Sequence, residues 1–211
     1  MLVGRGALSF KTFEVSGKNP TPSHERLLER LEQFAFAGID AQEEGAVHGW
    51  VAPDHLFDGD FASPKVFRGQ YALFALRIDT KKVPGPVLAA HTALAIAAAC
   101  EADGVEKLPA KQKRDLKREV KRQLLAETPP VQRAYGVFWN VRARKVFLQS
   151  TSKAVVEAFR ALFERAFELN LEPHSPGMRA AQFARERGLT QALREARPLA
   201  LYTSDRALAA V

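Results

Sequence analysis

The sequence has one cysteine, Cys100, among 211 residues. That excludes an intrachain disulfide and any zinc site built from cysteines. Its alanine-rich surroundings predict a small buried side chain there. The longest apolar run, Val87 to Cys100, is interrupted by polar residues and is too short to predict a membrane span. We also expect no signal peptide, because no long apolar segment lies near residue 1, and therefore a cytoplasmic protein.

Motifs of the common enzyme classes are missing as well. Gly17-Lys18 lacks the upstream glycines and the following Ser or Thr of a phosphate-binding loop. No Gly-x-Ser-x-Gly nucleophile turn occurs. The sequence thus gives no positive indication of an enzyme, and we expect no cofactor.

Positive charge is concentrated in one segment. Between Lys107 and Arg122 the chain has eight basic and two acidic residues, and the window extended to Lys145 reaches a net charge of +9. The whole chain carries only +7, so the remainder sums to about −2. Such a segment predicts a polyanion-binding surface, because cations that neutralise phosphates release condensed counterions. A solvated helix face is the alternative interpretation.

An acidic loop with Asp54, His55, Asp58 and Asp60 is the best candidate for a metal site. A metal-dependent nuclease would need such carboxylates close to bound phosphate. However, aspartate and glycine are also typical of turns, and no second motif completes a two-metal site. The loop is therefore more simply interpreted as surface, and no metal is assigned.

Short strands mixed with helices predict an α+β fold with an antiparallel sheet. Ser23 is placed to cap a helix that we expect to end at Gly38. Trp50 and Trp139 lie in strand-like segments and are predicted core residues. The other expected elements are strands at 7–15, 47–51, 134–141 and 145–149, an apolar segment at 66–78 that forms one strand or a pair bent at Gly69, a helix after Ser152, and short helices at 178–187 and 189–196.

Two helices between Pro84 and Pro130 are predicted to project from the sheet as an arm, residues 84–130. The second helix, about 110–125, has a narrow apolar seam of Leu116, Val120 and Leu124. We expect its lysine and arginine rows on the side away from this seam. The predicted domains are the sheet (1–83 and 131–175), the arm, and a short helical C-terminal segment (176–211).

Several segments together resemble the family of the recombination-associated protein RdgC. Gly49-Trp50-Val51-Ala52-Pro53 is similar to its Gly-Trp-Val-x-Pro signature, and Val83 to Val87 is similar to its entry into a long helix. Further similar segments, in the same order, are Phe10-Lys11, 27–36, 111–120 with Leu124-Leu125, Trp139-Asn140, 146–148 and 151–154.

The resemblance implies a non-enzymatic, largely sequence-independent double-stranded DNA-binding protein of the bacterial nucleoid. It further implies a ring-shaped homodimer that restrains the RecA recombinase. The family's helix tip continues with a cation and an aromatic residue, whereas Ala126 to Pro130 has neither. We therefore expect the arm to hold DNA by its phosphates without wedging it.

The predicted DNA contacts are basic residues that lie on the second arm helix and on the following hairpin turn. They are Lys111, Lys113, Arg114, Lys117, Arg118, Lys121 and Arg122 on the helix, and Arg142, Arg144 and Lys145 on the turn. Two alternatives stay open: a protein-interaction module that acts on a recombinase, and a metal-dependent nuclease.

Overall fold

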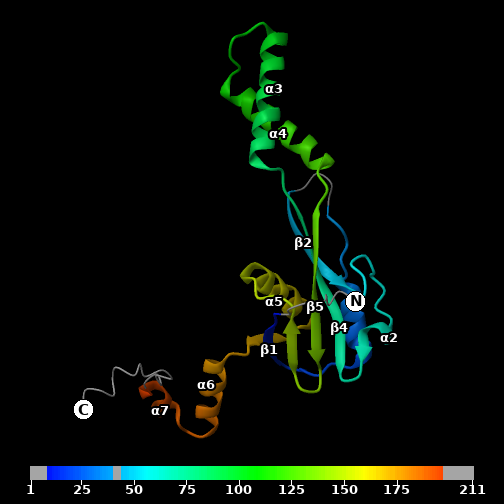
Figure 1. Ribbon diagram of the computed structural model, residues 1–211, viewed down its shortest axis with the longest axis vertical. Coiled ribbons are helices and arrows are strands. Elements are labelled where there is room, and N and C mark those ends of the chain that lie inside the picture. The colour runs from blue at the N-terminus through cyan, green and yellow to red at the C-terminus, as the bar shows by residue number, and fades with distance from the viewer. Residues whose placement is uncertain (1–8, 40–43, 197–211) are drawn as a thin grey trace, which may run out of the picture. The chain divides into compact units, whose positions relative to one another are not determined.

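The structure of the protein is a computed structural model that describes residues 9–39 and 44–196 (Figure 1). The chain divides into a unit of residues 1–172 and a unit of residues 173–211. The first unit contains an antiparallel sheet with helices, which confirms the α+β class. Residues 7–8 of the first predicted strand and 197–211 of the C-terminal segment lie outside the described residues. The finer division into sheet and arm domains stays a prediction.

The sheet has the strand order β2-β4-β5-β6-β1-β7, with β3 pairing to β4. The long antiparallel pair of β4 and β5 forms its centre, with Tyr71 opposite Asn140 and Thr80 opposite Val131. The strands are β1 (Lys11–Ser16), β2 (Gly45–Val51), β3 (Phe67–Arg68), β4 (Tyr71–Lys81), β5 (Val131–Asn140), β6 (Lys145–Leu148) and β7 (Asn170–Pro173).

Seven helices lie in the described residues, five of them in the first unit. Ser23 caps the first helix as predicted, because its hydroxyl accepts a hydrogen bond from the Arg26 amide. Ser152 holds the corresponding position before α5, but its side chain makes no capping bond. The helices are α1 (His24–Gln33), α2 (Ser63–Val66), α3 (Gly85–Asp103), α4 (Ala110–Glu127), α5 (Lys153–Phe167), α6 (Pro176–Glu186) and α7 (Thr190–Glu195).

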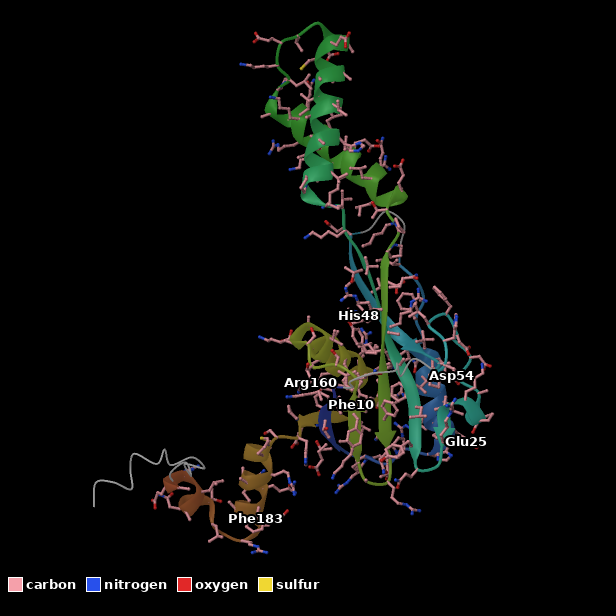
Figure 2. The ribbon with its side chains drawn as sticks, viewed as in Figure 1. Phe10, Glu25, His48, Asp54, Arg160 and Phe183 are labelled. Carbon is pink, nitrogen blue, oxygen red and sulfur yellow. The ribbon has the colours of Figure 1, made fainter. Side chains whose placement is uncertain are left out.

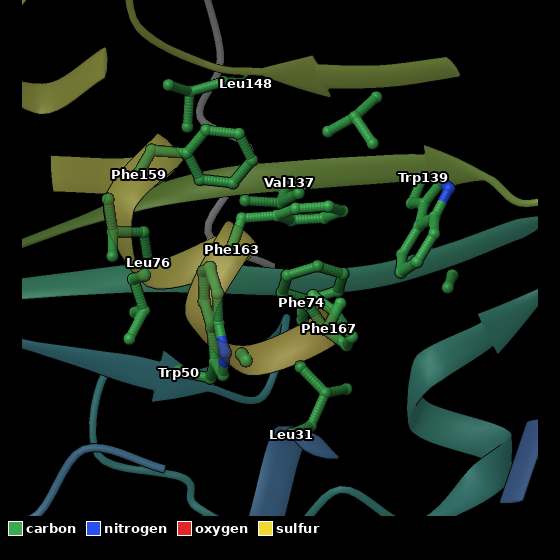
Figure 3. Packing of buried hydrophobic residues seen from close by; sticks show 14 of the residues in the cluster. Leu31, Trp50, Phe74, Leu76, Val137, Trp139, Leu148, Phe159, Phe163 and Phe167 are labelled. Atoms are coloured by element: carbon green, nitrogen blue, oxygen red, sulfur yellow. The ribbon is translucent and has the colours of Figure 1, made fainter. Parts of the chain in front are cut away.

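An aromatic core fills the space between the sheet and α5 (Figure 3). Trp50 and Trp139 are fully buried, which confirms their prediction as core residues. The Trp139 ring lies 5.0 Å from Phe163, and Phe163 lies 4.7 Å from Phe167. Because α5 places a phenylalanine on its inner face at nearly every turn, its aromatic rings form a large part of this core.

The first helix is shorter than predicted. It ends at Gln33, not at Gly38, and the next residues leave the helix to pair with β2. The Phe36 amide donates to the Trp50 carbonyl at 2.9 Å, and the Trp50 amide donates to the Phe34 carbonyl at 3.0 Å. Apolar residues at helical spacing had suggested a longer helix, but backbone pairing to a distant strand determines the end.

The apolar segment 66–78 forms the bent pair that was one of its two predicted alternatives. Strand β3 turns at Gly69, where φ is +62°, and β4 follows. Glycine adopts this left-handed conformation without strain. The short helix α2 and strand β7 were not predicted, whereas α6 and α7 confirm the two C-terminal helices.

Along the chain, both helices of the arm lie between β4 and β5, which are neighbouring strands of the sheet (Figure 1). The chain leaves β4 after Lys81 and re-enters β5 at Val131, which lies opposite Thr80. Helix α3 is closed by Gly104 in the left-handed conformation, which glycine adopts without strain. The arm is therefore an insertion into the β4–β5 connection.

Helix α3 is apolar yet has no buried residue. Leu94 is 70% exposed, and Cys100 is half-buried rather than buried as predicted. By length and composition alone α3 is long and apolar enough to cross a membrane, contrary to the sequence expectation. An exposed apolar helix of this size marks a surface that can associate with another apolar surface.

Candidate nucleic-acid interface

The basic residues of α4 divide into an exposed and a half-buried group. Lys113 and Lys121 are half-buried, so they do not lie fully opposite the apolar seam as expected. At 100° per residue, Lys113 lies only about 20° from Val120 around the helix. The exposed group is Lys111, Arg114, Lys117, Arg118 and Arg122.

The apolar seam itself is wider than predicted. Val120 and Leu125 are buried, and Leu116 and Leu124 are half-buried. Leu125 was not part of the predicted stripe. Leu125 lies in the last turn of α4, six residues before β5 begins at Val131.

Three of the α4 cations form ion pairs. Arg118 pairs with Asp115, Arg122 pairs with Glu119 at 2.8 Å, and Lys121 pairs with Glu44. The hydrogen bonds from Arg122 hold the pKa of the Glu119 carboxyl below its ordinary value. Exposed pairs of this kind are weak, but they reduce the positive charge that these cations offer to a ligand.

The other four α4 cations, Lys111, Lys113, Arg114 and Lys117, have no ion pair with any residue that the structure describes. A surface hollow of about 540 Å³ runs along this part of the helix. It is lined by Lys111, Arg114, Asp115, Lys117, Arg118 and Lys121. Five cations around one hollow form a site that is suited to phosphate groups.

The turn between β5 and β6 carries the second predicted group. Arg142, Arg144 and Lys145 likewise have no ion pair within the described part of the chain. The Asn140 side chain accepts a hydrogen bond from the Ala143 amide at 2.9 Å, and Arg144 has a φ of +53°. The turn is therefore held in a defined conformation.

The structure does not bring the two basic groups together. The arm is joined to the start of β5 and the turn to its end, so the whole strand separates them (Figure 1). A strand of ten residues spans roughly 30 Å. The α4 surface and the β5–β6 turn are thus separate parts of any nucleic-acid interface.

The carboxylates of the acidic loop are paired with cations. Lys65 donates to Asp58 at 2.8 Å and to Asp60 at 2.9 Å, and Arg68 pairs with Asp54 at 2.5 Å. The hydrogen bond from Lys65 holds the pKa of Asp58 below its ordinary value. The carboxylates of the loop are thus neutralised by cations of the neighbouring α2 and β3.

His55 also has a structural role in this loop, because its Nδ1 accepts a hydrogen bond from the Phe57 amide at 3.2 Å. Among residues 9–39 and 44–196, no group of three His, Cys, Asp or Glu side chains is placed to hold a metal ion. This geometry favours the surface-loop interpretation of residues 54–60.

A buried ion pair lies beneath the same loop. Arg77 binds Asp79 through two hydrogen bonds of 2.8 and 2.7 Å, and its guanidinium lies between the rings of Phe36 and Phe57, at 4.1 and 4.8 Å. Gly49 is required beside it, because a Cβ there would lie 2.3 Å from the Phe36 Cα. The pair fastens the loop to β4.

The sequence analysis missed a group of aromatic side chains on the face of the sheet away from α5. Phe10, Tyr71, Phe138 and Phe147 line a hollow of about 340 Å³ (Phe10 is labelled in Figure 2). Strand alternation could have predicted this position for Phe138, because Phe138 is adjacent to the core residue Trp139 and must point to the opposite face.

The chain matches the model of a known protein family. The model of a family described as "RdgC: Putative exonuclease, RdgC" matches residues 10–192, which is most of the chain. A comparison with curated proteins finds no match.

Proposed function

The chain belongs to the RdgC family, and on that premise we propose that it binds double-stranded DNA without sequence preference and without cleaving it. Family membership supports a recombination-related protein of the nucleoid. To this we add double-stranded DNA as the ligand, bound without sequence preference. We also propose that the protein restrains a RecA-type recombinase. The proposal also includes a cytoplasmic location on the nucleoid and a homodimeric state.

One observation carries the proposal: the unpaired cations Lys111, Arg114 and Lys117 are exposed around one hollow on α4. Phosphates of a duplex present negative charge at regular intervals, and lysine and arginine neutralise it irrespective of sequence. Contacts to base edges are typically made by side chains such as Asn, Gln or Arg aimed into a groove. The α4 surface offers mainly charge, which favours non-specific binding.

The apolar side chains of α3 are exposed, which favours a binding partner that covers them. We propose that this partner is a second copy of the chain. A bilayer is a poorer partner on physical grounds. Helix α4 returns the chain to β5, so a membrane-spanning α3 would draw the cations of α4 toward the hydrocarbon, where each is costly. Association of two α3 helices buries the same apolar area at no such cost.

The direct test is a charge reversal at the three exposed, unpaired cations: Lys111→Glu, Arg114→Glu, Lys117→Glu. Loss of three phosphate contacts should reduce the slope of log K against log salt by about 2.7 and weaken duplex binding at least tenfold at moderate salt. Fluorescence anisotropy with two unrelated duplexes at several salt concentrations measures both quantities.

The matched control is Lys153→Glu, Arg160→Glu, Arg165→Glu on α5, which makes the same change in net charge at residues outside the arm and the turn. It should retain most of the duplex affinity. Equal losses in both variants would mean that overall charge, not the α4 surface, drives binding. An unchanged affinity in the α4 variant would reject the proposed site.

The word exonuclease in the family's description makes a cleavage assay worthwhile. Linear and circular DNA are incubated with the protein and Mg²⁺ or Mn²⁺. Because the carboxylates of residues 54–60 are paired with Lys65 and Arg68, we expect intact DNA. Degradation of the linear form that is abolished by EDTA would replace the binding proposal with a nuclease. The interaction-module alternative instead predicts weak duplex binding with retained capture of the recombinase.

A further inference from the structure

We propose that a hollow at the end of the sheet away from the arm binds a small anion with a planar ring, of the nucleoside monophosphate class. The hollow measures about 580 Å³ and is lined by residues from the start of α1, the β3–β4 turn and the β5–β6 turn. Small-molecule sites typically measure roughly 300–1,000 Å³. The site is distinct from the α4 surface, and its ligand is not part of the duplex proposal.

Each of the three segments around the hollow has a defined backbone conformation. Ser23 caps the start of α1 through its side chain. Gly69 turns the chain between β3 and β4 with a φ of +62°. Asn140 accepts a hydrogen bond from the Ala143 amide at 2.9 Å, in the turn that carries Arg142. The walls are therefore in place before a ligand binds, which lowers the entropic cost of binding.

One part of the hollow is apolar and aromatic. Pro22 and Ala72 contribute buried apolar surface. The His24 ring stacks on the Phe67 ring, with centres 3.8 Å apart and planes inclined by 17°. Both rings line the hollow, and His24 is exposed. A planar ligand can extend this stack, because aromatic rings associate favourably face to face with an offset.

The polar part of the hollow carries positive charge. Arg142 lines it, and none of its described lining residues is Asp or Glu. Arg142 is exposed and forms no ion pair or side-chain hydrogen bond with any residue that the structure describes. The side chains of Thr21 and Gln70, which also line the hollow, likewise have no hydrogen-bond partner among the described residues. A guanidinium without a partner is suited to a bidentate contact with phosphate.

These two parts decide which ligand fits. An apolar ligand would cover the rings but would desolvate the Arg142 guanidinium without pairing it. Inorganic phosphate would pair with the guanidinium but would leave the aromatic part empty. A nucleoside monophosphate has a planar base for the rings and a phosphate for Arg142. Its base edge also carries donors and acceptors, which the Thr21 hydroxyl and the Gln70 amide can meet.

The test measures binding of adenosine monophosphate by isothermal titration calorimetry, with adenosine and inorganic phosphate as its separate parts. The wild-type protein should bind the whole nucleotide at least tenfold more tightly than either part, because only the nucleotide stacks on the rings and pairs with Arg142. Equally tight binding of phosphate alone, or no saturable binding of the nucleotide, would overturn the proposal.

Substitutions separate the two parts of the site. Arg142→Gln should weaken nucleotide binding at least tenfold and leave adenosine affinity within about twofold, because it removes only the charge. His24→Ala should weaken both ligands about three- to tenfold, because it shortens the stack. The matched control is Arg144→Gln, the same change on the same turn at a residue that does not line the hollow, and it should leave both affinities unchanged. Equal losses in the two arginine variants would overturn the proposal.

Nuclear magnetic resonance locates the ligand on the unaltered protein. Adenosine monophosphate should shift the amide signals of His24, Gln70 and Val141, and shifts confined to α4 would reject the site. Duplex binding is measured separately. Arg142→Gln and Arg144→Gln each remove one cation of the turn, so each should lower the salt slope of duplex binding equally, by about 0.9. Failure of the duplex proposal would appear as weak duplex binding with the nucleotide signal intact.

Discussion

Helices α5 and α3 are both rich in apolar residues, but they lie in opposite environments. Helix α5 buries six residues against the sheet, and α3 buries none. In α5 the large side chains recur at helical spacing along one face, whereas in α3 alanines surround the helix evenly. The comparison shows that the arrangement of apolar residues, more than their number, determines which helix builds a core. Helix α5 supports the fold, and α3 presents a surface.

The strongest test of this contrast compares truncations of one large side chain in each helix. Phe163→Ala should destabilise the protein by about 3–5 kcal/mol, because it leaves a cavity among buried rings. Leu94→Ala should change the free energy of unfolding by less than about 0.5 kcal/mol. Denaturant unfolding measures both. A comparable loss from Leu94→Ala would show that α3 is packed in the folded protein.

The second test concerns the buried charge that fastens the acidic loop to β4. Asp79→Asn keeps the shape of the side chain but weakens two charge-assisted hydrogen bonds with Arg77. The expected cost is about 1.5–3 kcal/mol in the free energy of unfolding. Lys65→Met, which removes two partly exposed ion pairs between α2 and the same loop, is the control and should have little effect. Equal effects of the two changes would contradict the structural role of the buried pair.

The smallest expected effect is a dependence of stability on pH. His48 is exposed on β2, but partial desolvation, and secondarily the positive charge of Arg165, hold its pKa below 6.5. The unfolded chain then binds a proton at higher pH than the native protein does, so stability falls as the pH drops below about 6.5. His48→Gln should lessen the difference between melting temperatures at about pH 7.5 and about pH 5.5. A variant with the full wild-type difference would assign the dependence to other groups.

Local patterns were sufficient to predict the features that depend on near neighbours. The hairpin of β5 and β6, the two helices of the arm and the aromatic face of α5 follow from alternation, prolines and helical spacing. Burial of both tryptophans follows for the same reason. The concentration of charge on α4 follows from local composition. Helical geometry alone then suffices to predict a basic surface.

Contacts between distant segments account for what the sequence did not predict. The end of α1 depends on hydrogen bonds between Phe36 and Trp50, and Lys121 meets Glu44 only after the arm is in place. The ion pairs of the acidic loop could not be assigned from spacing, because turns also favour aspartate. The hollow around Phe138 combines residues of β4, β5 and β6 with Phe10, which precedes β1, so its existence depends on strand register.

The pairing of Thr80 with Val131 has a consequence for how the chain can change over evolutionary time. Because the arm departs and returns at adjacent positions of two bonded strands, its length, charge and apolar surface can vary while the sheet keeps its register. Insertions into a connection between two bonded strands leave their pairing unchanged, as is typical of connecting segments. The ligands and assemblies that the arm serves can therefore change without a new fold.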